Sequence, residues 1–431
     1  DALSVQGLGS GTVTFGVHIA APGLAIAPDS ALDKVARERL STVYMPGWKL
    51  TMLPDAVVQA YTLDAGRDCP AVSQYFTIDE ATLEVRSSET RLERVAVVTN
   101  LRHDRLDAQI TEATLGGAAP ADYPHAPELA FAFRLALQLK AQRERVRGKP
   151  EVFTRPDYSF RLDGDGDGEP LGDERVHISP RQRGAPLDLI VSEAMILANS
   201  RWGAWLAECG VPGIYRSQAA LAPGIKVRMG TRPAVHAGMG VAQYTWASSP
   251  LRRYVDLVNQ WQIIACARHG RTAALAAPFK PKDAALLSII SAFDAAYASY
   301  NDFQNTIERY WTLRWLQQNA VTELDAAVMK DGLVRAATLP LVFRLPGSEG
   351  LPRGSHVRAR VAGIDLLTLE LHAVLLARID SAAPDAAGEP EPEDESPDAG
   401  ALRLAIELDD AAGDAAMPPG GPAAPAAPAA A

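Results

Sequence analysis

The chain has 431 residues, a net charge of −10, 47% apolar and 22% charged side chains, and three cysteines. This composition is ordinary for a globular protein and argues against a fibrous repeat or a fully disordered chain. Because no run of 18 apolar residues is present, we expect no membrane span. Residues 1–20 also lack the basic start and apolar block of a signal peptide. The three cysteines are far apart, which predicts reduced thiols in a cytoplasmic protein.

The negative charge is concentrated in the C-terminal segment. Residues 381–431 carry eleven acidic side chains against a single base, Arg403, so residues 1–380 are neutral overall. Net charge therefore neither supports nor excludes a polyanionic partner, and the placement of individual charges must decide. The segment is also rich in alanine and proline, and we expect it to be disordered because it buries too little apolar surface.

Periodicity predicts the elements of the remainder in chain order. Alternating residues around three glycines in 1–20 predict a β-hairpin, and the alternation over 71–100 predicts further antiparallel strands. Helical patterns are predicted at about 30–40 with Ser30 as N-cap, at 126–148, at 186–208, from Ser249 onward, and at 283–319. Short β-branched and leucine-rich runs over 333–379 are typical of a small five-stranded OB-type barrel.

The most informative motif is Tyr-Thr-Trp-Ala-Ser-Ser-Pro-Leu-Arg-Arg-Tyr-Val-Asp over residues 244–256. Ser249 suits an N-cap, and the following proline suits a first helical position. Arg252 and Arg253 would then occupy the first turn, where the helix dipole disfavours cations. Free N–H groups, serine hydroxyls and two guanidinium groups together predict a phosphate site. The alternative is a plain helix start with Arg252 paired to Asp256.

A second motif places polar residues in an apolar helix. Glu193 and Asn199 lie within the run 192–199, whose other positions are almost all apolar. We expect this helix to be buried, so both polar side chains need partners. The pattern alone favours structural hydrogen bonds at both positions.

Two further patterns resemble metal sites without their usual context. Residues 163–174 match the spacing of an EF-hand calcium loop, but the flanks alternate like strands, which favours an acidic hairpin turn over calcium binding. His18 has no Cys or His at ligand spacing, which favours a hydrogen-bonded core histidine.

Several motifs in order resemble one family. They are Asp-Ala-Leu-Ser at 1–4, Gly-Val-His-Ile-Ala at 16–20, Tyr-Met-Pro-Gly at 44–47 with Met-Leu-Pro at 52–54, Arg-Pro-Asp-Tyr at 155–158, Glu-Ala-Met at 193–195 with Ala-Asn at 198–199, and Ser-Ser-Pro-Leu-Arg-Arg-Tyr at 248–254 with Asp256. The chain thereby resembles the ribonuclease II/R exoribonucleases over roughly residues 1–320. Each motif is moderately specific, and the ordered set is strongly so.

The resemblance implies an α+β fold with an RNB catalytic domain, a mixed sheet wrapped by helices, over 1–331. It also implies an OB-fold RNA-binding barrel over 332–380, with 401–409 as a candidate completing segment, followed by the acidic tail 381–431. The implied activity is processive 3′→5′ hydrolysis of single-stranded RNA to nucleoside 5′-monophosphates with Mg²⁺. We expect a cytoplasmic monomer.

Residue roles follow from the resemblance position by position. Asp1 is the last of the metal-site aspartates, and Arg252 clamps the scissile phosphate, so these two are the expected catalytic residues. The expected RNA-binding residues include two stacking aromatic rings, one residue near the 3′ end and three near the phosphates. These are Tyr44, Phe153, Glu193, Asn199, Ser249 and Arg253.

The chain departs from the family pattern at several positions. The other metal-site aspartates of the family precede the position of Asp1, Ala21 stands where the family has Asp, and Cys69 stands where it has Arg. Leu-Asp-Ala at 106–108 stands where a tyrosine is often found, which weakens the expected base clamp at that subsite. The second hypothesis is therefore a catalytically silent RNA-binding relative that retains the channel.

Overall fold

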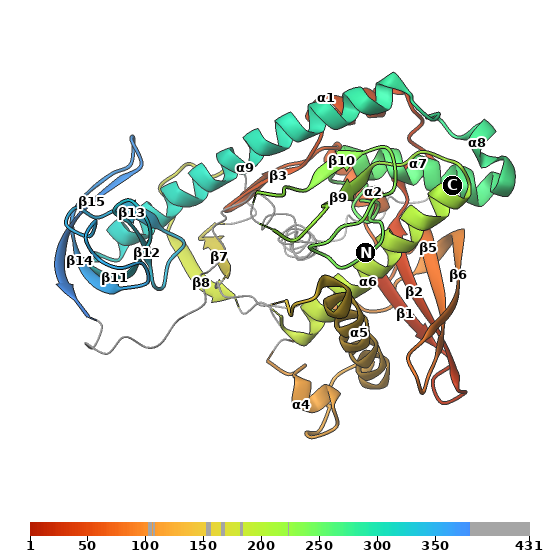
Figure 1. Ribbon diagram of the computed structural model, residues 1–431, viewed down its shortest axis with the longest axis horizontal. Helices are drawn as coiled ribbons and strands as arrows, with labels where there is room; N and C mark the ends of the chain where they lie inside the picture. The colour runs from red at the N-terminus through yellow and green to blue at the C-terminus, as the bar shows by residue number, and fades with distance from the viewer. Residues whose placement is uncertain are drawn as a thin grey trace, which may run out of the picture.

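The computed structural model describes residues 1–101, 106, 108–151, 157–164, 169–181, 184–222 and 224–379 (Figure 1). It combines antiparallel sheets with long helices, so the α+β class is confirmed. Within these residues no helix is both long enough and apolar enough to cross a membrane. Cys69, Cys209 and Cys266 are free thiols.

A four-stranded antiparallel sheet begins the chain, in the order β1-β2-β5-β6. Its strands are β1 (Ala2–Gln6), β2 (Thr12–Ala20), β5 (Asp68–Asp79) and β6 (Val85–Ala96). The predicted hairpin is confirmed, with Ala2 opposite His18 and Gln6 opposite Thr14. At the β1–β2 turn, Glu80 accepts hydrogen bonds from the N–H groups of Gly9 and Gly11, which fixes the turn against the end of β5.

Helices cover this sheet and continue beyond it (Figure 1). They are η1 (Pro22–Leu24), α1 (Ala31–Arg39), α2 (Asp55–Tyr61), α4 (Glu112–Leu115), α5 (Ala126–Arg147), α6 (Pro186–Glu208), α7 (Tyr254–His269), η2 (Gly270–Thr272), α8 (Ala273–Ala276) and α9 (Ala284–Gln318). The helices predicted at 30–40, 126–148, 186–208 and 283–319 are confirmed. Ser30 caps α1 by accepting from the Asp33 N–H at 3.2 Å.

The core lies where α6 and α7 pack together. One apolar cluster joins β2, α5 and α6, and a second joins α1, α7 and the first half of α9. Every residue of α7 from Tyr254 to Cys266 is buried, so this helix runs through the interior. Side chains projecting from α6 and α7 are therefore held rigidly, which suits a functional site.

Three short hairpins complete this part of the chain. They are β3 (Val43–Met45) with β4 (Trp48–Leu50), β7 (Asp157–Leu162) with β8 (Val176–Arg181), and β9 (Tyr215–Ser217) with β10 (Arg228–Gly230). Tyr44 therefore lies on a strand, within the Tyr-Met-Pro-Gly motif. The backbone of Lys49 lies opposite it.

A curled five-stranded antiparallel sheet forms a separate region with its own apolar cluster (Figure 1). Its strands are β11 (Glu323–Val328), β12 (Leu333–Ala336), β13 (Val342–Arg344), β14 (His356–Asp365) and β15 (Glu370–Arg378). The order β13-β12-β11-β14-β15 is consistent with an OB-like fold. The sheet begins at Glu323, so its first strand precedes the expected boundary at 331. Residues 401–409 lie outside the described residues.

Candidate functional site

The segment before α7 departs from the predicted helix start. Helix α7 begins at Tyr254, five residues after Ser249, so the N-cap assignment of Ser249 is wrong. The reason is a long-range backbone pairing. The Thr42 N–H donates to the Arg252 carbonyl, and the Tyr254 N–H donates to the Leu40 carbonyl, both at 2.8 Å. This pairing holds Arg253 extended beside the end of α1, so the helix can start only after it.

Arg253 and Asp256 form a buried pair at the start of α7. The Arg253 Nε and Nη2 atoms donate to the two Asp256 carboxylate oxygens, each at 2.7 Å, and the Ser249 N–H also donates to Asp256. The alternative pairing expected from sequence, Arg252 with Asp256, is thus replaced by Arg253 with Asp256. Burial lowers the pKa of Arg253, but the Asp256 carboxylate raises it by more, so the guanidinium stays charged.

Two buried polar atoms at this site have no hydrogen-bond partner within the described part of the chain. They are Nη1 of Arg253 and Oγ of Ser249. A buried polar group without a partner is costly, and in native proteins it often marks the place of a ligand or an ordered water. The guanidinium and hydroxyl groups are the types that bind phosphate oxygens.

A pocket of about 30 Å³ opens beside Arg253. It is lined by Ser41, Thr42, Tyr44, Arg252, Arg253, Tyr297, Asn301 and Gln304. Three of the residues predicted from sequence, Tyr44, Arg252 and Arg253, therefore meet in one place, although Tyr44 is some 200 residues away in the chain. An aromatic ring beside two cations can accept a base and a phosphate at the same time. We call this feature the Arg253 pocket.

Asn199 of α6 supports the segment that leads to Ser249. It is fully buried, its Oδ1 accepts from the Ala247 N–H at 3.0 Å, and its Nδ2 donates to Ser248 Oγ at 3.1 Å. Its backbone carbonyl accepts from the Thr245 hydroxyl. The expectation that this amide has structural partners is confirmed, while its place near RNA phosphates stays a prediction.

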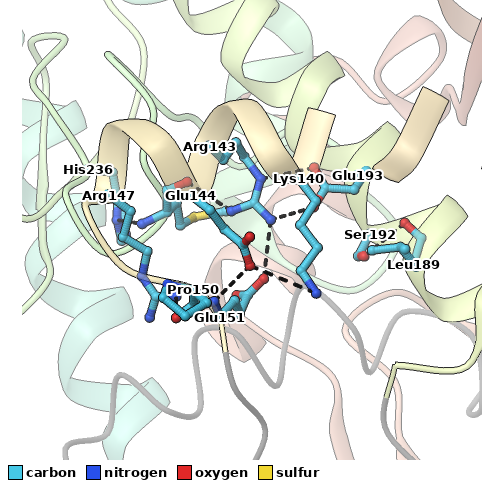
Figure 2. Close-up of polar contacts among 11 residues, drawn as sticks. Lys140, Arg143, Glu144, Arg147, Pro150, Glu151, Leu189, Ser192, Glu193 and His236 are labelled. Atoms are coloured by element: carbon cyan, nitrogen blue, oxygen red, sulfur yellow. Dashed lines mark hydrogen bonds and ion pairs between the residues drawn. The ribbon is translucent and has the colours of Figure 1, made fainter. Parts of the chain in front are cut away.

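Glu193, one and a half turns earlier on α6, lies in a second polar cluster (Figure 2). Arg143 of α5 donates from Nε to Glu193 Oε2 at 2.9 Å and from Nη2 to the other carboxylate oxygen. Burial raises the pKa of Glu193, and the Arg143 charge opposes that rise. The expectation of a structural partner is thus confirmed, and contact of Glu193 with the RNA 3′ end stays a prediction.

Arg143 also joins parts of the chain beyond α6. Its Nη1 donates to the Met239 carbonyl at 2.9 Å, and its Nη2 lies 3.3 Å from Glu151 Oε2. The Glu151 backbone N–H donates to Glu144, as Figure 2 shows. One side chain thereby ties together α5, α6, the loop at Met239 and the chain just after α5. We call this feature the Arg143 joint.

The expected metal site is not assembled by the described residues. Asp1 is exposed and immediately precedes β1. Across the described ranges, no group of three or more His, Cys, Asp or Glu side chains could hold an ion. A hydrolytic Mg²⁺ site needs several oxygen ligands, so Asp1 by itself does not fit the ion and we derive no catalytic step through it. Phe153 lies outside the described residues.

The other two metal-like patterns have structural explanations. His18 is buried between Ser73 Oγ at 2.8 Å and Ser4 Oγ at 2.9 Å, which confirms a hydrogen-bonded core histidine, and burial lowers its pKa to about 4. Strands β7 and β8 pair in register around 163–174, which confirms a hairpin. The Glu174 carboxylate there accepts backbone N–H groups of Leu171 and Gly172. Residues 165–168 lie outside the described part.

Sequence reasoning missed three residues of the site. Asp256 was considered only as a partner of Arg252, and Trp246 was treated as part of a motif without a role. Arg143 has no predicted role beyond its place in the helix expected at 126–148. A usable signal existed for Arg143, because it lies four residues after Leu139 and continues the buried face of α5.

Comparison with known proteins agrees with this geometry. The family model of the RNB domain matches residues 1–227 and 223–269. An uncharacterized ribonuclease of Synechocystis sp. is 26% identical over 397 residues, covering 85% of this chain and 55% of that protein. The chloroplastic/mitochondrial ribonuclease II of Arabidopsis thaliana is 24% identical over 397 residues, covering 84% and 46%. The chain thus spans about half the length of the curated relatives it matches.

Solved structures share the fold. An active-site mutant of the Dss1 exoribonuclease from Candida glabrata superposes with a TM-score of 0.69 at 20% identity, covering 87% of this chain and 52% of that one. Mycoplasma genitalium RNase R in complex with ribose-methylated single-stranded RNA gives 0.70 at 14%, covering 87% and 68%. Yeast Ssd1, described as a pseudonuclease, gives 0.58 at 16%, covering 84% and 50%. The chain is a ribonuclease II-like member of the RNB domain family.

Proposed function

We propose that this chain contains the catalytic region of an exoribonuclease that degrades single-stranded RNA from the 3′ end and releases nucleoside 5′-monophosphates. Membership of the RNB family supports ribonuclease chemistry. The observation that carries the proposal furthest is the Arg253 pocket, where Tyr44, Arg252 and Arg253 meet and where Arg253 Nη1 has no hydrogen-bond partner among the described residues.

In this proposal the chain's own residues bind and orient the RNA. Tyr44 stacks on a base near the 3′ end, which tolerates any sequence because every base has a π-face. Arg252 holds the scissile phosphate and stabilises the charge that grows on it during hydrolysis. Arg253 and Ser249 hold a neighbouring phosphate through the Nη1 and Oγ atoms. The Asp256 carboxylate keeps Arg253 in place while this happens.

The expected cofactor is Mg²⁺, the ion that supplies a nucleophilic water and charge stabilisation in hydrolases of this kind. Asp1 is the one ligand we assign to it, and further carboxylates would have to complete the site. We further propose a monomeric, cytoplasmic protein, which gel filtration and fractionation would test.

A time course on a 5′-labelled single-stranded RNA tests the proposal. With Mg²⁺ we expect labelled products that shorten stepwise from the 3′ end, together with the release of mononucleotides. When unlabelled RNA is added as a trap, each enzyme molecule should continue to degrade the labelled RNA it has already bound, as a processive enzyme does. EDTA should abolish cleavage. Internal cleavage, or shortening from the 5′ end on a 3′-labelled substrate, would refute the proposed direction.

The second candidate function is RNA binding without cleavage. One observation favours it: the fold is shared with yeast Ssd1, which is described as a pseudonuclease. RNA binding without cleavage predicts that the protein binds the labelled RNA in a salt-dependent way and forms no product at any Mg²⁺ or Mn²⁺ concentration. Product formation that Asp1→Asn abolishes would exclude it.

A further inference from the structure

The environment of Trp246 is unusual because two arginines lie over one buried indole ring. The Cζ atom of Arg253 is 4.2 Å from the ring centroid, and the Cζ atom of Arg216 is 3.9 Å from it. The indole is only 2% exposed, and both guanidinium groups are buried as well. Both distances are well within the range over which a cation is attracted to an aromatic face.

The two arginines reach Trp246 from separate elements. Arg216 belongs to β9, whose backbone is hydrogen-bonded beside the indole because the Arg216 N–H donates to the Tyr244 carbonyl at 2.8 Å. Arg253 precedes α7, 37 positions further along the chain. The indole therefore gathers two positive charges in the interior, next to the Arg253 pocket. Burying two cations near each other is unfavourable unless negative charge compensates them.

Two carboxylates lie near these arginines. Asp256 is engaged by two nitrogens of Arg253 and by the Ser249 N–H. Asp294 lies close enough to interact with the charge of Arg216. A buried guanidinium group beside a pocket suits the binding of an anion such as phosphate.

The indole and Asp256 restrain Arg253 in complementary ways. The two hydrogen bonds to Asp256 fix the guanidinium within its own plane. The indole ring, whose centroid lies 4.2 Å from Cζ, blocks movement of the guanidinium toward it. What remains is Nη1, which has no hydrogen-bond partner in the described residues. A donor restrained in both senses needs little reorganisation when an anion arrives.

From this geometry we propose that Trp246 is a positioning residue that holds Arg253 in place to bind an RNA phosphate, with Arg216 adding a second positive charge behind it. The proposal rests on the proposed function, because the anion it names is the phosphate of that RNA. Trp246 acts through Arg253 and touches no RNA itself. A smaller aromatic ring should retain this role, and an aliphatic side chain should lose it.

The test measures RNA binding separately from cleavage. Binding of a fluorescent 3′-hydroxyl oligoribonucleotide is followed in EDTA across a salt series, for the wild type, Trp246→Phe and Trp246→Leu. We expect Trp246→Leu to bind about ten-fold more weakly and with a shallower salt dependence, and Trp246→Phe to stay within about three-fold of wild type. Trp261→Leu is the matched control, since this buried indole contacts aromatic rings of Tyr254 and Phe279. It should lose stability but retain affinity.

A double-mutant cycle distinguishes positioning from simple packing. In an Arg253→Met background, Trp246→Leu should cost little further affinity, because the group it positions is gone. An equal loss in both backgrounds would overturn the proposal, as would wild-type affinity for Trp246→Leu. If Trp246→Leu does not fold, fluorinated tryptophan placed at this position keeps the shape and weakens the cation–π attraction. Affinity that does not fall with fluorination would then overturn it.

Failure of the proposed function has a different signature in the same experiment. If the wild type binds no RNA at any salt concentration, the proposed function is refuted. If the wild type binds RNA and Trp246→Leu binds equally well, only the positioning role is refuted.

Discussion

Arg143 and Arg253 are both buried, and each binds a carboxylate through two nitrogens. They differ in whether the third guanidinium nitrogen has a hydrogen-bond partner. Arg143 uses Nε, Nη1 and Nη2 on Glu193, Met239 and Glu151. Arg253 uses Nε and Nη2 on Asp256 and leaves Nη1 without a partner among the described residues. All three guanidinium nitrogens of Arg143 donate to protein acceptors, whereas Nη1 of Arg253 has no acceptor among the described residues. The two arginines are alike in burial and differ in hydrogen bonding, and this difference is the reason for proposing a binding role for Arg253 alone.

The largest effect should come from breaking the Arg143 joint. Arg143→Met leaves Glu193 as a buried carboxylate without its cation, which should cost about 3–5 kcal/mol in the free energy of unfolding measured with urea. Adding Glu193→Gln should restore a substantial part, because the uncompensated charge is removed. If the double variant is as unstable as the single one, lost packing and not charge explains the joint.

The second largest effect should be that of Arg252→Ala, in the Arg253 pocket, on the turnover of RNA. We expect turnover of single-stranded RNA to fall by about 100- to 1000-fold with an unchanged unfolding midpoint, since a contact to developing charge is lost. Single-turnover kinetics with saturating enzyme measure this step directly. The control is Arg86→Ala, which removes an exposed arginine that pairs with Asp79 on the sheet and should cleave like the wild type. Near-normal turnover of Arg252→Ala would contradict the phosphate role.

Acid should weaken the fold through His18, away from both arginine pairs. Its pKa is lowered to about 4 from 6.5, so below pH 6.5 the unfolded chain gains a proton that the folded chain does not. Stability should fall by about 1.4 kcal/mol for each pH unit between roughly 6.5 and 4. Neither arginine titrates in this window. Urea unfolding at several pH values would detect the slope, which His18→Gln should flatten.

The smallest effect concerns Tyr44 at the edge of the Arg253 pocket. Tyr44→Ala should lengthen the final oligonucleotide product while slowing cleavage by less than about ten-fold, because one base–aromatic contact is lost. Tyr44→Phe keeps the ring and should give the wild-type product. Denaturing gels of the end products make the comparison. An unchanged product length in Tyr44→Ala would argue against stacking.

Local patterns predicted the long elements well. Proline at the first position of α6 and the Ser30 cap of α1 are signals contained within a few residues, and both elements start where predicted. The start of α7 was wrong, although Ser249 and Pro250 form a good local start signal. Leu40 and Thr42, more than 200 residues earlier, hold Arg253 extended, and no local window contains that information.

The sequence predicted several of the residues that line the Arg253 pocket, but it did not predict the contacts between them. Arg252 and Arg253 precede α7 and do not occupy its first turn as predicted, but the pocket brings Tyr44 to both of them. Asp256 pairs with Arg253 and not with Arg252. This choice depends on the path of the backbone before α7, which contacts with Leu40 and Thr42 determine. The two arginines on Trp246 could not be predicted, because Arg216 reaches the indole only after β9 pairs beside it.

Helix α9 gives these separate contacts a mechanical consequence. Its 35 residues form one continuous helix of about 52 Å. Tyr297, Asn301 and Gln304 line the Arg253 pocket. Five residues after Gln304, Arg309 donates to the carbonyls of Val342 in β13 and of Leu369 just before β15, the strands at the two ends of the curled sheet's strand order. The helix thus connects the Arg253 pocket to the curled sheet. We expect a displacement of the curled sheet to move the pocket wall as well. Arg309→Ala should weaken this coupling, and amide exchange near Asn301 would report the change.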